Sequence, residues 1–208
     1  MFCSLFALSA CNDDDDAPVD ETPQPSYFQT SVGSYWVYDT YSIDAAGTEI
    51  LFAQGDTVFA TGDTLVDGET YYKFYGKLHA LTSIKHNALL RDSLGYILQL
   101  GKTGRYVMSY SNLDTVLSTF RHENSSLFHS LKMKRVTDVL ELPSGTFSNV
   151  LDAELTTYRV SDSSVVGITN NYFGEGIGQL TKTIFYSGAF LGNQSYFEGR
   201  LVAYYIAP

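Results

Sequence analysis

Cysteine is scarce in this chain, and both cysteines, Cys3 and Cys11, lie close to its N-terminus. The rest of the sequence therefore has no disulfide, no thiol nucleophile and no thiolate ligand for a metal. A domain built from it must be held together by its hydrophobic core. The roughly 180 residues that remain are enough for one such core.

Basic residues are missing from a third of the chain, since the first lysine or arginine is Lys73. The whole chain has 13 basic and 23 acidic residues, and its net charge is −10. A negative protein is repelled by phosphate backbones and by anionic lipid head groups. The sequence therefore argues against a nucleic-acid partner, and it predicts that any membrane association comes through a lipid anchor only.

Long hydrophobic runs are also missing. The apolar run at Met1–Ala10 is too short to cross a bilayer, because ten helical residues span about 15 Å of a hydrocarbon core of about 30 Å. The run ends in small residues before a cysteine, which predicts a signal peptide over residues 1–10. A start assigned too far downstream accounts for its short length and for the absence of a preceding basic residue.

The segment Leu8-Ser9-Ala10-Cys11 resembles the lipobox of bacterial lipoproteins. That resemblance implies that Cys11 carries the lipid and becomes the first residue of the mature chain. The acidic run Asn12–Asp16 resembles the signal that sends some Gram-negative lipoproteins to the outer face of the outer membrane; a solvated spacer has the same composition. We therefore expect a lipid-anchored outer-membrane protein at the cell surface, with the periplasmic face as the alternative.

A tether follows the lipid attachment site. Residues 11–26 contain three of the five prolines and six acidic residues, a composition that stiffens and extends a chain. We expect these residues to hold a single domain, residues 27–208, away from the membrane.

The composition and spacing of this domain predict β structure. The chain has 16 Tyr, 13 Phe and 17 Gly, and turn signals recur every 8–15 residues or so, as in antiparallel sheets. Residues 35–43 alternate, with Trp36, Tyr38 and Thr40 on one face. Asp67-Gly68 between two β-prone runs predicts a type I′ hairpin, because that turn needs positive φ at both positions.

The expected fold is mainly β, a single antiparallel domain that forms a curled sheet, a half-barrel or a β-sandwich. His79–Asp92 and Leu127–Leu140 are ambiguous: Leu81, Ile84 and Ala88 fit a helical face, whereas the second segment fits neither period cleanly. We therefore allow at most one or two short helices.

Several short motifs resemble a broad group of mostly uncharacterised bacterial lipoproteins. Gly33-Ser34-Tyr35-Trp36-Val37-Tyr38 matches the Gly-x-x-Trp-x-Tyr with which such domains open, and Phe147-Ser148-Asn149-Val150 matches a later strand. The resemblance implies an architecture and a location, and no activity comes with it. Some lipoproteins with such sheets, those like the lipoprotein carriers, curl them over an apolar cavity, which is an analogy of fold.

The motifs that usually carry chemistry are incomplete here. The glycines of Gly174–Gly178 precede a strand pattern, which predicts a tight turn instead of a dinucleotide loop. His122-Glu123 lacks the second histidine of a zinc protease, and none of the four histidines has a third ligand at suitable spacing. Asp152 and Glu154 share a strand face and could form a glycosidase pair, but a solvated face explains them more simply. The sequence therefore predicts no catalytic residue, no metal site and no cofactor.

Three functions remain open. The first is a non-enzymatic lipoprotein with a binding or structural role, which contacts a protein or glycan through aromatic-rich strands. The second is a carrier of a lipid or other apolar ligand in a cavity of a curved sheet. The third is a secreted hydrolase. A carrier requires a cavity that the core leaves unfilled, a binding module requires exposed aromatic side chains, and an enzyme requires converging acids or histidines in a cleft.

Overall fold

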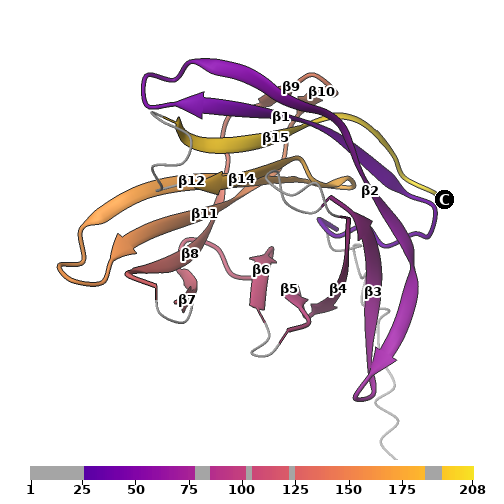
Figure 1. The fold of residues 1–208 in the computed structure, drawn as a ribbon. Coiled ribbons are helices and arrows are strands. Elements are labelled where there is room, and N and C mark those ends of the chain that lie inside the picture. Colours follow the sequence, from indigo (N-terminus) through magenta and orange to yellow (C-terminus); the bar gives the residue numbers. More distant parts are fainter. Residues whose placement is uncertain (1–25, 78–84, 102–104, 122–124, 186–193) are drawn as a thin grey trace, which may run out of the picture.

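The structure, a computed structural model, describes residues 26–77, 85–101, 105–121, 125–185 and 194–208 (Figure 1). All regular secondary structure in these ranges is β-strand, and they contain no helix. The expected all-β antiparallel fold is confirmed. The predicted signal peptide, Cys11 and most of the tether lie outside the described residues.

The larger sheet has eight strands, and all of its neighbours pair antiparallel. Its order is β14-β15-β1-β2-β3-β4-β5-β6. The strands are β1 (Tyr35–Asp44), β2 (Glu49–Val66), β3 (Glu69–Gly76), β4 (His86–Ser93), β5 (Tyr96–Gln99), β6 (Arg105–Ser109), β14 (Thr181–Phe185) and β15 (Gln194–Tyr205).

The smaller sheet has five antiparallel strands in the order β13-β12-β11-β8-β7. A separate two-stranded hairpin lies beside β15. The strands of the smaller sheet are β7 (Val116–Phe120), β8 (Leu127–Arg135), β11 (Val150–Arg159), β12 (Val165–Gly174) and β13 (Gly178–Gln179), and those of the hairpin are β9 (Leu140–Leu142) and β10 (Gly145–Phe147).

The two sheets curl toward each other and meet along β12 and β14 (Figure 1). Side chains replace the regular ladder there: the N–H of Thr183 donates to Oδ1 of Asn171 at 2.7 Å, and the N–H of Tyr172 donates to Oγ1 of Thr181 at 2.9 Å. At the other end of each sheet, β6 contacts β7. The strands therefore enclose an interior, as expected of curled half-barrels.

The local predictions with clear physical causes are confirmed. Trp36, Tyr38 and Thr40 are buried, whereas their neighbours Tyr35 and Val37 are half-buried. Asp67 and Gly68 have φ of 52° and 82°, as a type I′ turn requires. Gly176 and Gly178 also have positive φ in the turn between β12 and β13, so the glycines after residue 173 form the predicted tight turn.

Two segments depart from regular or expected strand structure. Strand β2 is long, and its register with β1 shifts around Gly55. The N–H of Gly55 donates to Oδ1 of Asp39 at 2.9 Å, which replaces a ladder bond at the irregularity. Within Leu127–Leu140, residues 127–135 form the strand β8. The sequence of this segment has no clear period, and its pairing with β11 determines that it is a strand.

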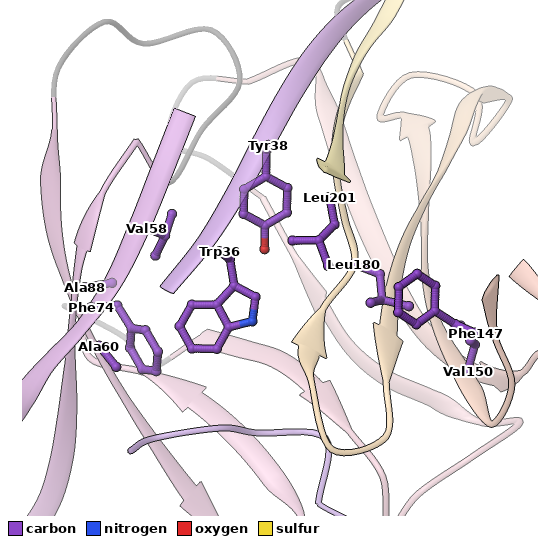
Figure 2. Packing of buried hydrophobic residues seen from close by; sticks show 10 residues of the cluster. All are labelled: Trp36, Tyr38, Val58, Ala60, Phe74, Ala88, Phe147, Val150, Leu180 and Leu201. Atoms are coloured by element: carbon purple, nitrogen blue, oxygen red, sulfur yellow. The ribbon is translucent and has the colours of Figure 1, made fainter. Parts of the chain in front are cut away.

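The core beneath β1 is built around two aromatic side chains (Figure 2). Trp36 donates from Nε1 to the carbonyl of Ile177 at 2.8 Å, and the Tyr38 hydroxyl donates to the carbonyl of Gln179 at 2.7 Å. Both rings are buried, and both polar atoms are satisfied, so burial carries no cost of an unpaired donor. These bonds fix the turn after β12 against β1. A second buried cluster, which includes Ile97, Met108, Met133 and Leu151, lies between β5, β6 and the smaller sheet.

Candidate functional site: a pocket between the sheets

The core leaves a pocket of about 510 Å³ between the two sheets. Strands β4, β5 and β6 line one side of it, and β7, β8, β11, β12 and β14 line the other (Figure 1). Strand periodicity places the lining, because alternate residues of β8 and β11 point inward. Leu127, Leu131 and Leu155 supply much of the apolar surface, together with Leu90, Val107 and Ile184.

Polar side chains interrupt this lining at a few positions. His129 and Thr157 face each other across β8 and β11, with 3.0 Å between Nδ1 and Oγ1. Gln99, Asn171 and Thr183 also line the pocket. An apolar pocket with a few placed polar groups is the usual form of a small-molecule site.

The charge of the lining is opposite to that of the whole protein. Arg105 and Lys182 line the pocket, and no aspartate or glutamate is among the described residues that do so. The chain as a whole carries a net charge of −10. The basic lining residues therefore differ in sign from the molecule as a whole.

Arg105 joins the two sheets where β6 meets β7. Its guanidinium lies over the ring of Phe120, with 4.7 Å from Cζ to the ring centroid. Phe120 in turn stacks on His129, with 5.0 Å between centroids and 27° between the ring planes. Arg105 is exposed, whereas Leu131, Ala153 and Phe173 on the opposite side of the pocket are buried. Arg105 therefore marks the rim of the pocket, and those three residues mark its floor.

Lys182 is a buried cation at the inner end of the pocket, and only 7% of it is exposed. Its Nζ lies 3.5 Å from the ring centroid of Tyr38 and donates to the carbonyl of Lys77 at 3.1 Å. The neighbouring carboxylate of Asp56 is itself paired with Lys77 at 2.5 Å. Burial lowers the pKa of Lys182 to about 7, and the charge of Asp56 opposes this shift only in part. The ammonium thus points away from the pocket, which only the rest of the side chain lines.

The pair Asp152 and Glu154 does not lie in the pocket. It occupies the opposite face of β11 from Ala153 and Leu155, which do line it. A glycosidase-like pair in the cleft is therefore absent from the described residues. The expectation that both acids are solvated is also wrong for Asp152, which is 6% exposed.

The physical reason is that β12 covers Asp152. Asn170 Nδ2 donates to its Oδ2 at 2.6 Å, and its buried Oδ1 has no hydrogen-bond partner. Burial raises the pKa of Asp152 to about 6, although the bond from Asn170 opposes the shift. Glu154 instead pairs with Lys134. This site is a buried carboxyl group in the wall of the smaller sheet, apart from the pocket.

A row of aromatic side chains crosses the outer face of the larger sheet. Tyr205, Tyr35, Phe59 and Tyr75 are cross-strand partners on β15, β1, β2 and β3. The centroids of Tyr35 and Tyr205 are 5.8 Å apart, and those of Tyr35 and Phe59 are 6.2 Å apart. Phe59, Tyr75 and Tyr205 are exposed. The sequence predicted exposed aromatics in general terms, and their register makes them one continuous patch.

The remaining candidate residues, the other histidines, do not form a site among the described residues. His86 is exposed, and His79 and His122 lie outside the described residues. Within the described ranges, no three His, Cys, Asp or Glu side chains converge in a way that could hold a metal ion. In the same part of the chain, no helix has the length and apolarity of a membrane span.

Comparison with known proteins gives a likeness of fold. No protein-family model matches the sequence, and no curated protein matches it. A protein of Parabacteroides distasonis ATCC 8503, described as "a putative lipoprotein", superposes with a TM-score of 0.50 at 10% identity. A protein of Bacteroides fragilis NCTC 9343, described as "a putative exported protein with YmcC-like fold", gives 0.47 at 10% identity. Each alignment covers 87% of this chain and 99% of the other.

Proposed function

We propose that this protein is a lipoprotein anchored through Cys11 and that its domain carries an apolar small ligand in the pocket between the sheets. The pocket supports this role most directly, because about 510 Å³ remains unfilled between walls rich in leucine. Small-molecule sites commonly have volumes of about 300–1,000 Å³.

The proposed location is the outer membrane, at the cell surface. Leu8-Ser9-Ala10-Cys11 supports the anchor, and the acidic run after Cys11 supports transport to the outer face. A protein of similar fold is described as a putative lipoprotein, which supports the lipid anchor. The proline-rich residues up to Ser26 would hold the pocket above the membrane surface.

Filling the pocket tests the carrier function. Leu155 lines the pocket and is half-buried, so Leu155→Trp places an indole in the space that the ligand would occupy. We expect this change to weaken binding of dodecanol by at least about tenfold, since it removes room for about two buried methylenes. Isothermal titration of the full-length chain with Cys11→Ser, which lacks the lipid, measures the effect.

The matched control is Leu65→Trp, because Leu65 is 72% exposed and does not line the pocket. This variant should bind dodecanol like the parent chain. Equal binding by the Leu155→Trp and Leu65→Trp chains would show that the ligand does not enter the pocket.

The aromatic row on the outer face supports a second function, the binding of a protein or glycan partner. Exposed tyrosines supply large contact areas with a polar end. The single tryptophan, Trp36, is buried and takes no part in such a surface. A chain with both Tyr35→Ser and Tyr205→Ser should no longer capture a partner from the native envelope. Capture that persists in this chain would contradict the role.

The third alternative, a hydrolase, has less support, because the described lining holds one histidine and no carboxylate.

A further inference from the structure

We infer that the ligand of the pocket is an amphiphile with an anionic head group, and that Arg105 binds this head group at the rim. The inference rests on the proposed carrier function and specifies its substrate class. Its first support is the charge of the lining: the guanidinium of Arg105 faces the apolar space, and no carboxylate is among the described residues that line it. In a protein of net charge −10, such a site attracts an anion that the outer surface repels.

Arg105 has the free donors that a head group needs. Its guanidinium contacts the face of Phe120, and within the described part of the chain none of its five N–H groups has a hydrogen-bond acceptor. A ring face attracts the cation without neutralising its charge. The planar edge of the guanidinium therefore remains available for a carboxylate or a phosphate, which it fits with two parallel bonds.

Lys182 is a poorer candidate for this contact, although it is the other cation of the lining. Its ammonium is held by the ring of Tyr38 and the carbonyl of Lys77, outside the pocket. Its donors therefore point away from the pocket. The direct contact to an anion therefore falls to Arg105.

The order of the lining gives the ligand a direction. Arg105 is exposed and lies over Phe120, the strand partner of His129. The next lining positions along β8 and β11 are the partners Leu131 and Leu155, and Ala153 follows them on β11. A head group at Arg105 would keep its contact with water, while the tail covers the leucines. This arrangement avoids the cost of burying a charge without water or full pairing.

A head-group series tests the inference. Isothermal titration of the full-length Cys11→Ser chain with dodecanoate, dodecyl phosphate, dodecanol and dodecyltrimethylammonium keeps the tail constant while the charge changes. We expect the better of the two anions to bind at least about tenfold more tightly than dodecanol, and the cation to bind most weakly. The ratio between dodecanoate and dodecyl phosphate identifies which acid the rim prefers, and either preference supports the inference.

Variants of Arg105 assign the effect to its side chain. Arg105→Gln should weaken binding of the anions more than that of dodecanol and bring the two within about twofold of each other. Arg135→Gln is the matched control, because Arg135 is exposed at the far end of β8 and does not line the pocket, and it should leave all affinities unchanged.

The failures are distinguishable. If none of the four probes binds, the carrier function itself is wrong. If dodecanol binds as tightly as both anions, the pocket is a carrier site but the inferred substrate class is wrong. If Arg105→Gln weakens dodecanol and the anions alike, Arg105 shapes the pocket and does not recognise charge, which overturns its assignment.

Discussion

Replacing Lys182 with methionine is expected to raise the free energy of unfolding near pH 5 by on the order of 3 kcal/mol. Methionine keeps most of the length of the lysine side chain and removes the buried ammonium. The change also removes the contact with the Tyr38 ring and the bond to the Lys77 carbonyl, which offsets part of the gain. The expected stabilisation follows from the burial of the amine, because burial disfavours its charged form.

The gain should depend on pH in a defined direction. The unfolded chain keeps the Lys182 proton up to the ordinary pKa of 10.5, whereas the folded protein releases it at about 7. Between these values the unfolded state binds more protons, so the stability that this site confers on the parent protein rises with pH. The advantage of Lys182→Met is therefore full below about pH 7 and disappears as the pH approaches about 10.

Urea denaturation of both chains at a series of pH values measures this difference. Lys85→Met is the matched control, because Lys85 also lies over a tyrosine ring, that of Tyr75, but is exposed. It should change stability by less than about 1 kcal/mol at any pH. A Lys182→Met chain that is less stable than the parent near pH 5 would contradict the claim that the buried amine destabilises the folded protein.

Replacing Asp152 with asparagine should stabilise the protein near pH 8 by about 2 kcal/mol. The folded pKa is about 6 and the ordinary value is 3.8, so the folded state binds more protons between them. The stability that Asp152 confers therefore falls as the pH rises through this window, and above it the cost of the buried charge is complete. Asparagine is neutral throughout, so its advantage is full above about pH 6 and fades below about pH 4.

The same denaturation series tests this second variant, with Asp138→Asn as the control because Asp138 is exposed. The two substitutions should show opposite trends, since the benefit of Lys182→Met is lost as the pH rises and that of Asp152→Asn is lost as the pH falls. An Asp152→Asn chain with the same stability change at pH 8 and pH 4 would show that this carboxyl group is solvated.

Features set by neighbouring residues could be predicted from the sequence. The alternation around Trp36 and the positive φ values at Asp67-Gly68 depend on side-chain period and turn chemistry, which are local. The same is true of the turn at Gly176. These patterns gave the β class, the β2–β3 hairpin and the inner face of β1.

The pocket could not be predicted, because it depends on how distant strands pack. Leu127, Leu131 and Leu155 have the spacing of core residues, and nothing in the sequence separates a leucine that faces a void from one that faces another side chain. Arg105 likewise reads as an ordinary charged residue at a strand end. Its role emerges only when β6 is placed beside Phe120 of β7.

Asp152 shows the same limit in another form. Its alternation with Leu151 and Ala153 correctly placed it on the face away from the pocket. Alternation assigns a face but does not say whether another element covers that face. Here Asn170 of β12 and the nearby ring of Tyr172 lie close to the carboxyl group, and they turn an expected solvated acid into a buried one.

The central claim is that the pocket carries an amphiphile, and native mass spectrometry of the protein tests it most directly. The full-length Cys11→Ser chain would be produced in the envelope of a Gram-negative bacterium, purified without detergent, and then extracted with organic solvent to identify any released molecule. The account predicts one bound amphiphile per chain, lost in the Leu155→Trp variant and retained in Leu65→Trp. A chain of bare mass that also stays bare after incubation with lipids extracted from the same envelope would contradict the account, and would favour partner binding through the aromatic row.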